Sequence, residues 1–287
     1  MASRPEPGRA GVVRSGRRHG RGLRAPALLA VAVVVAVALA AASIFGGRSA
    51  SFSYSSPFDR FPAGPAAATA RALGGGTPPD SVAFLESVTT DVQGFWSREF
   101  ARSGRPYAPA AVVVFRRATQ SGCGLASSQT GPFYCPLDHT VYLDPGFFRE
   151  LAVKFQAPGS FADAYVLAHE LGHHVQTLTG ITRQVDRARA AQPALSNVLS
   201  IPLELQADCL AGVWGHSTYD RGLIDRGELD QALRAAAAVG DDRIQKRTIG
   251  RIIPEAWTHG SSAQRRSWFL RGFEAGDPNA CDTFAGL

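Results

Sequence analysis

At residues 160–180 the chain reads SFADAYVLAHELGHHVQTLTG. The apolar residues recur at the three- and four-residue spacing of an α-helix and leave it little polar surface. Ser160 and Asp163 fit a capping box at the start of this helix, and Gly180 fits a C-terminal stop. We therefore expect a largely buried helix over this stretch.

Two histidines of this helix, His169 and His173, lie on one face about one turn apart. Imidazoles so placed can bind one zinc ion, and Glu170 beside them can act as general base on a water that zinc activates. The alternative is a pair of histidines on the helix surface. Buried histidines need partners, however, and a metal ion is a suitable one. His174 is turned away from the ligand face and is expected to pack or to support the ligands.

Catalytic zinc usually has three protein ligands, so a further ligand is expected elsewhere in the chain. Glu204 and Asp208 lie one helical turn apart among apolar neighbours. A solvated helix face would also place two carboxylates this way, but buried carboxylates are costly unless they are paired or metal-bound. One can bind zinc while the other orients a ligating imidazole. Pro202 indicates that this helix begins near Ser200 or is kinked there.

Strands are predicted early in the chain and helices late. β-Branched or alternating runs predict strands at 110–115 and 139–144, and residues 123–135 are expected to form a loop. Helical spacing predicts further helices at 81–100, 194–216, 227–239 and 261–275. This order favours an α+β domain.

The N-terminal region differs in composition from the rest. Seven arginines and one glutamate give residues 1–24 a net charge of +6, which is the net charge of the whole chain. Residues 25–287 are therefore neutral overall and offer no basic surface for nucleic acid. Residues 25–47 carry no charge and would span roughly 34 Å as a helix, enough to cross a bilayer. The alternative is a cleaved signal peptide ending near Ala40–Ala42.

Charge distribution gives the orientation. A basic segment before a membrane helix stays in the cytoplasm, so we expect residues 1–24 to form a cytoplasmic tail and residues 25–47 a single-pass anchor in the cell membrane. Residues 48–80 are rich in Gly, Pro, Ser and Ala and are expected to form a flexible linker. The folded domain is expected at 81–287, outside the cytoplasm.

Several separated motifs resemble the neutral zinc metallopeptidases of bacteria, also called YpfJ-like proteins. They are SGCG (121–124), GPFYCP (131–136), VYLD (141–144), AHELGHHVQ (168–176), LELQADCLAGVW (203–214), GDDR (240–243), THG (258–260) and CDTF (281–284). The resemblance covers 81–287 and does not extend over the anchor and linker. It implies a zincin-like HExxH peptidase of the gluzincin type, with a small sheet and several helices.

By position, the resemblance implies that His169, His173 and Glu204 bind one zinc ion. Glu170 would be the catalytic base, and Asp208 would orient a ligating histidine. By analogy of fold, an edge strand near the metal often pairs with extended substrate, and Val141–Asp144 is the candidate.

The resemblance also implies a downstream histidine and arginine near the site, here His259 and Arg265. His259 would donate a hydrogen bond to the developing oxyanion. The alternative is a helix-capping histidine, because Ser261 and Gln264 fit a capping box just after it. Asp241 and Asp242 are expected to form a cap and turn rather than a second metal site.

The four cysteines are compatible with export. A short-range disulfide between Cys123 and Cys135 and a second one between Cys209 and Cys281 are expected, with buried free thiols as the alternative.

Together these features predict a membrane-anchored zinc metallopeptidase that hydrolyses a peptide or protein substrate outside the cytoplasm. The alternatives are a zinc-stabilised envelope binding module without turnover, and an amidase acting on cell-wall peptides. A fourth protein ligand such as His216 would favour the binding module, whereas an open coordination position and a substrate-sized cleft would favour an enzyme.

Overall fold

The structure is a computed structural model that describes residue 52 and residues 54–62, 82–285 and 287. The expected cytoplasmic tail, the expected membrane anchor and most of the expected linker lie outside these residues. Among the helices that are described, none has the length and apolar character needed to cross a bilayer.

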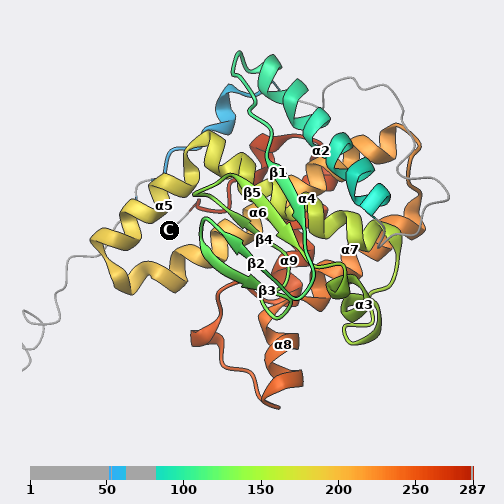
Figure 1. The fold of residues 1–287 in the computed structure, drawn as a ribbon. Helices are drawn as coiled ribbons and strands as arrows, with labels where there is room; N and C mark the ends of the chain where they lie inside the picture. The colour runs from blue at the N-terminus through green and yellow to red at the C-terminus, as the bar shows by residue number, and fades with distance from the viewer. Residues whose placement is uncertain (1–51, 53, 63–81, 286) are drawn as a thin grey trace, which may run out of the picture. The chain divides into compact units, whose positions relative to one another are not determined.

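The described residues form an α+β fold, as predicted, in which helices dominate and the sheets are small (Figure 1). The helices are α2 (Val82–Arg102), α3 (Gly146–Val153), α4 (Ser160–Thr179), α5 (Ile181–Ala191), α6 (Ser196–Asp220), α7 (Arg226–Ala238), α8 (Asp241–Thr248) and α9 (Ser262–Ala275). The strands are β1 (Ala111–Val114), β2 (Ala118–Ser121), β3 (Gly124–Ser127), β4 (Phe133–Cys135) and β5 (Thr140–Leu143). Short 3-10 turns occur at Phe58–Arg60, Pro193–Leu195, Pro254–Ala256 and Pro278–Cys281.

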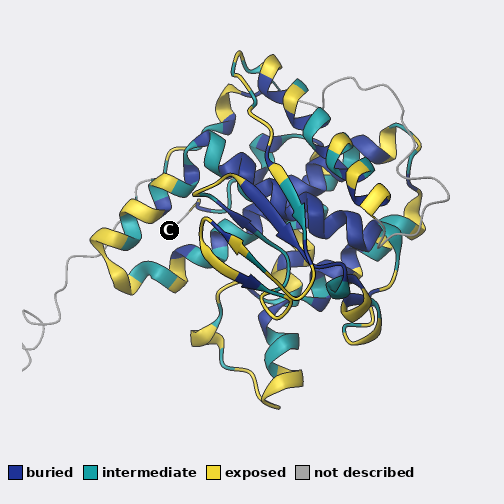
Figure 2. Ribbon diagram, in the orientation of Figure 1, coloured by how far each residue is buried: buried dark blue, intermediate teal, exposed yellow. Residues whose placement is uncertain are grey.

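Helix α4 is the centre of the domain. Sixteen of its twenty residues are buried, and it packs against α2, α6 and α7 (Figure 2). Gly180 ends the helix in the left-handed conformation, as predicted. The predicted capping box is wrong, because Gly159 occupies the N-cap position and Ser160 is already helical. Instead, Gln231 of α7 accepts a hydrogen bond from the backbone N–H of Phe161 at 3.1 Å.

The main sheet has the strand order β1-β5-β4, with β1 parallel and β4 antiparallel to the central strand β5. Strands β2 and β3 form a separate antiparallel hairpin. The prediction of a loop over 123–135 is therefore wrong at β3 and β4. These strands are only four and three residues long, and they are defined by their partners rather than by a pattern of their own. Strand β4 is an edge strand that contacts α4.

Helix α6 begins at Ser196, close to the predicted residue 194, and continues through Pro202, so a start near Ser200 is excluded. It lies close to α4 where Gly172 faces Ala207. A Cβ atom at Gly172 would meet the Ala207 carbonyl oxygen at 3.1 Å and its Cα at 3.2 Å, closer than side chains normally approach. The missing side chain lets the two helices approach each other.

Part of the expected linker belongs to the folded domain. Phe58 and Phe61 are buried in the main hydrophobic core, and Asn279 donates a hydrogen bond to the Phe61 carbonyl at 3.2 Å. The domain therefore begins well before residue 81. Gly, Pro and Ser residues suggested a linker, but the aromatic residues between them have apolar partners to pack on. The rest of the expected linker, residues 48–51, 53 and 63–80, lies outside the described residues.

Both expected disulfides are present. Cys123 is joined to Cys135 at the end of β4, and Cys209 of α6 is joined to Cys281 near the C-terminus. Free thiols are therefore excluded, since these are all four cysteines of the chain.

Candidate metal centre and cleft

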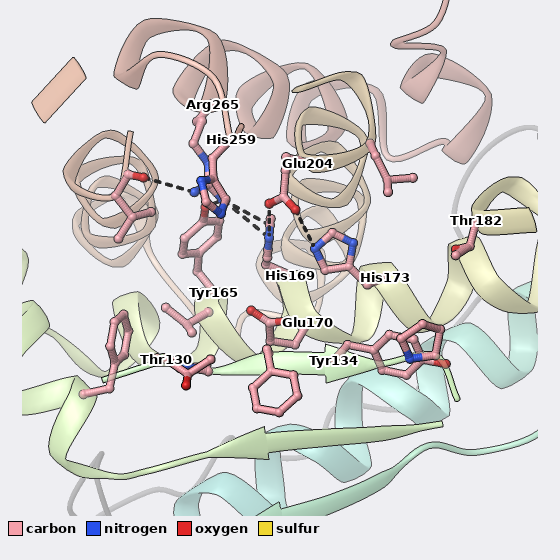
Figure 3. Close-up of a pocket in the computed structure, with 18 of the residues that line it drawn as sticks. Thr130, Tyr134, Tyr165, His169, Glu170, His173, Thr182, Glu204, His259 and Arg265 are labelled. Carbon is pink, nitrogen blue, oxygen red and sulfur yellow. Dashed lines mark hydrogen bonds and ion pairs between the residues drawn. The ribbon is translucent and has the colours of Figure 1, made fainter. Parts of the chain in front are cut away.

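His169 and His173 of α4 and Glu204 of α6 meet at one point (Figure 3). The Glu204 carboxylate oxygens lie 3.2 Å from Nε2 of His169 and 3.4 Å from Nε2 of His173. Two ligand atoms at about 2.0–2.2 Å from a tetrahedral zinc ion lie roughly 3.3–3.5 Å from each other. The spacing of these three donor groups therefore fits a zinc ion.

The tautomers of the two histidines also fit a metal ion. Nδ1 of His169 lies 2.9 Å from a carboxylate oxygen of Asp208, and Nδ1 of His173 lies 2.8 Å from the amide oxygen of Gln176. Both acceptors need a proton on Nδ1, which leaves a lone pair on each Nε2. Such hydrogen bonds are the usual support of zinc-binding histidines.

Asp208 is buried and joins several parts of the site. It accepts hydrogen bonds from Tyr165 at 2.6 Å and from two guanidinium nitrogens of Arg265 at 2.8 and 2.9 Å. Burial alone would raise the pKa of Asp208, but the charges of Arg265 and His169 hold it below its usual value. The structure therefore places Asp208 and Arg265 where the sequence predicted supporting residues.

Without a metal ion, the site favours a protonated His169 and an ionised Glu204. Burial alone would lower the pKa of His169, but Asp208 and Glu204 oppose this effect and raise it to about 10. Burial alone would raise the pKa of Glu204, but His173 and His169 hold it well below its usual range. The pocket thus stabilises positive charge, as expected of a cation site.

A cleft of about 510 Å³ opens beside these donor groups. Its wall includes Glu170, which is buried in α4 yet faces the cavity together with His169 and His173 (Figure 3). Aromatic and aliphatic side chains from α3, β4, the C-terminal end of α7 and α8 form much of the remaining wall; they include Phe133, Tyr134, Phe147, Val239 and Ile244. The cleft has the size and mixed lining of a binding site for part of a peptide.

His259 also faces the cleft, from the loop before α9. Nδ1 of His259 lies 3.2 Å from a carboxylate oxygen of Asp241, and this hydrogen bond raises the pKa of His259. The predicted capping box of Ser261 and Gln264 is confirmed. Ser261, and not His259, therefore caps α9.

Asp241 was expected to be a cap and turn, and its role here was not predicted. Its side chain accepts hydrogen bonds from the backbone N–H groups of Thr258, His259 and Gly260 at 2.8, 2.7 and 3.1 Å. The carboxylate therefore fixes both the loop and the imidazole ring of His259. The only sequence signal was an acidic pair before a helix, and its partners lie seventeen or more residues away along the chain.

The prediction of Val141–Asp144 as a substrate-binding edge strand is wrong. Strand β5 is central, since β1 and β4 occupy its two sides. The edge strand at the cleft is β4, whose Phe133 and Tyr134 line it.

The remaining histidines near the motif are not ligands. His174 is buried against Tyr134 and the Ala108 carbonyl, and His216 pairs with Asp220 and the Phe273 carbonyl. Within the described ranges, only His169, His173 and Glu204 form a cluster of three or more possible metal ligands. No described residue supplies the fourth protein ligand that would close the site.

The fold and the site define an α+β protein with a candidate His-His-Glu metal centre on a cleft. The chain belongs to the family described as "Putative neutral zinc metallopeptidase", whose profile matches residues 8–284. The match begins far upstream of residue 81, so the family resemblance is longer than the motifs indicated.

Similar proteins occur in distant bacteria. "Uncharacterized protein YpfJ" of Escherichia coli (strain K12) is 46% identical over 206 residues, which cover 71% of this chain and 72% of that protein. "Uncharacterized protein Rv2575" of Mycobacterium tuberculosis (strain ATCC 25618 / H37Rv) is 50% identical over 184 residues, which cover 60% of this chain and 61% of that protein. No solved structure matches the chain. The family match supports a zinc peptidase at the level of the family.

Proposed function

We propose that this protein is a membrane-anchored peptidase that hydrolyses peptide bonds outside the cytoplasm. The observation that carries the proposal is the position of Glu170 on the cleft wall, next to a three-residue donor set that fits zinc. Helix α4, edge strand β4 and the carboxylate on α6 together support the gluzincin-type, zincin-like arrangement. The uncharged segment 25–47, the basic tail before it and the two disulfides support the location.

His169, His173 and Glu204 would hold one zinc ion, and the ion would supply Lewis-acid chemistry that activates water and polarises a carbonyl. The Glu170 carboxylate then accepts a proton from the attacking water and passes it to the leaving amine. Its place in α4, next to His169 in the chain, fixes the carboxylate relative to the metal ligands.

His259 donates a hydrogen bond to the oxyanion as charge develops on the carbonyl oxygen. Asp241 holds Nδ1 of this imidazole, which leaves Nε2 as the nitrogen that can face substrate. The raised pKa of His259 keeps the ring protonated to higher pH than an isolated histidine, as a donor requires. Extended substrate would lie along β4, because an edge strand has unpaired backbone groups.

Two observations favour an enzyme over a binding module. The described residues contain no fourth protein ligand, which leaves a coordination position for water, and the cleft of about 510 Å³ can hold part of a substrate.

The test uses the full-length chain purified in detergent. About one zinc per chain is expected in the wild type, and His169→Ala is expected to lose it. Glu170→Gln should keep the zinc but lose hydrolysis of an unstructured protein by about 10²–10⁴-fold. A fully active Glu170→Gln variant would show that another group is the base. Cleavage of muropeptides but not of proteins would assign the site to a cell-wall amidase.

A further inference from the structure

A chain of buried amides connects the metal centre to both ends of the folded domain. It runs from His173 through Gln176 of α4 and Gln206 of α6, and both amide side chains are fully buried. At its far end Gln206 contacts Tyr54, in the segment before α2, and the carbonyl of Cys281, in the C-terminal segment. Among the residues linked in this way, only His173 is a candidate metal ligand.

The surroundings fix the direction of each amide. The Nε2 group of Gln176 donates to the Leu203 carbonyl at 2.7 Å and to Oε1 of Gln206 at 3.1 Å. Its Oε1 atom is therefore left to accept the Nδ1 proton of His173. The Nε2 group of Gln206 in turn donates to the Cys281 carbonyl at 2.9 Å and to the Tyr54 hydroxyl at 3.1 Å. Each amide N–H group of Gln176 and Gln206 thus has an acceptor, and all these hydrogen bonds run in the same direction, away from His173.

Tyr54 is held in place by its own packing. Its ring stacks on Phe284 with a centroid distance of 4.5 Å, and the ring of Phe52 lies 5.6 Å from Phe284 and 6.2 Å from Tyr54. Farther along the segment, Phe58 and Phe61 are anchored in the core. The C-terminal side of this contact is tied to α6 by the Cys209–Cys281 disulfide.

We propose that the N-terminal segment, residues 54–61, is a positioning element of the metal centre that acts through Gln206 and Gln176. Its hydroxyl acceptor at Tyr54 helps to keep the Gln206 amide from flipping. A flipped Gln206 amide would present N–H groups to Gln176, and a flipped Gln176 amide would present N–H groups to His173. The His173 proton would then move from Nδ1 to Nε2 and occupy the position of the metal ion.

The inference rests on the proposed metal site but adds a separate requirement. Gln176 is also held by the Leu203 carbonyl, so the effects should decrease along the chain. Loss of an orienting partner typically lowers metal affinity 10- to 100-fold, which we expect for Gln176→Leu. Tyr54→Phe removes one net hydrogen bond and is expected to lower zinc affinity about two- to ten-fold. Gln206→Leu should lie between these two.

The experiment measures zinc affinity of the full-length chain in detergent by competition with a chromogenic chelator. Gln184→Leu is the matched control. Gln184 contacts the same segment at Ser55, through its backbone N–H at 3.3 Å, but has no hydrogen bond to the buried amide chain. It should bind zinc like the wild type. Equal affinity of Tyr54→Phe, Gln206→Leu and the control would overturn the proposal.

A second measurement separates this inference from the metal site itself. In metal-free protein with ¹⁵N-labelled histidine, the nitrogen shifts report which ring nitrogen of His173 carries the proton. At a pH high enough to leave the ring neutral, the wild type and Gln184→Leu should show a proton on Nδ1, and Gln206→Leu should show a mixture of tautomers. If the wild type binds no zinc, the proposed function fails, yet this tautomer result still decides the role of the amide chain. An unchanged tautomer in Gln206→Leu would reject it.

Discussion

Replacing Asp208 by asparagine tests how the charges behind the metal centre are balanced. Asp208 accepts hydrogen bonds from Tyr165, His169 and Arg265, and it is completely buried. Arg265 is only 4% exposed, and Asp208 is its only ion-pair partner within 4 Å among the described residues. The substitution keeps the shape of the side chain but removes its charge, so a buried guanidinium loses its counter-ion.

Breaking a buried ion pair in this way typically costs about 3–5 kcal/mol. One kcal/mol shifts the melting temperature of a domain of this size by roughly 2–4 °C, so metal-free Asp208→Asn should melt about 6–20 °C lower. Zinc affinity should also fall about 10- to 100-fold, because Nδ1 of His169 loses its carboxylate. Tyr165→Phe is the control: it removes one hydrogen bond to the same carboxylate, at a cost of about 0.5–1.5 kcal/mol.

Thermal unfolding of the metal-free protein, followed by circular dichroism, measures the first effect. A double-mutant cycle with Arg265→Met attributes it to the ion pair, because removing both partners should cost less than the sum of the single changes. If Asp208→Asn melts no lower than Tyr165→Phe, Arg265 does not depend on Asp208 for its charge balance, and the reasoning fails.

Three further results are expected. Asp241→Asn should lower the pKa of His259, because this histidine gains its raised pKa chiefly from Asp241; a proton NMR titration of the metal-free protein measures this, and an unchanged midpoint would contradict it. The paired histidine stabilises the fold below its unfolded pKa of about 6.5, and this contribution should be lost as the pH rises through the folded pKa. Cys209→Ser opens a loop of 72 residues and should cost about 4 kcal/mol in chemical denaturation, whereas the same stability as the wild type would show that the cross-link is unimportant. A chain starting at residue 81 should be less stable than one starting at residue 48 by at least about 3 kcal/mol, since it lacks the buried Phe58 and Phe61; equal denaturation midpoints would place these rings outside the core.

Local patterns predicted the donor set because its members lie on two helices. The spacing of His169 and His173 is a property of one helix, and so is the spacing of Glu204 and Asp208. The approach of the two helices was not predicted, because it depends on Gly172 and on apolar packing that the spacing does not encode.

The residues that the sequence did not reveal have partners far along the chain. Gln176 acts through a carbonyl of α6, and Asp241 through a loop before α9. The short strands β3 and β4 are hard to predict, because glycine and proline at 122, 131 and 132 flank them and each strand offers few β-forming residues. Composition also did not indicate that the segment around Phe58 is part of the folded domain. The relevant signal there is the aromatic residues, which pack in the core.

The contact of Gly172 with Ala207 sets the distance between α4 and α6, and with it the distance between the candidate ligands on the two helices. Metal-to-ligand distances are tolerated within about 0.2 Å, whereas a methyl group at Gly172 would force α4 and α6 apart by a few tenths of an ångström. A side chain that touches no ligand would then move both histidines away from Glu204. Efforts to change which ion the proposed metal site prefers can therefore begin at position 172, without replacing any of the candidate ligands.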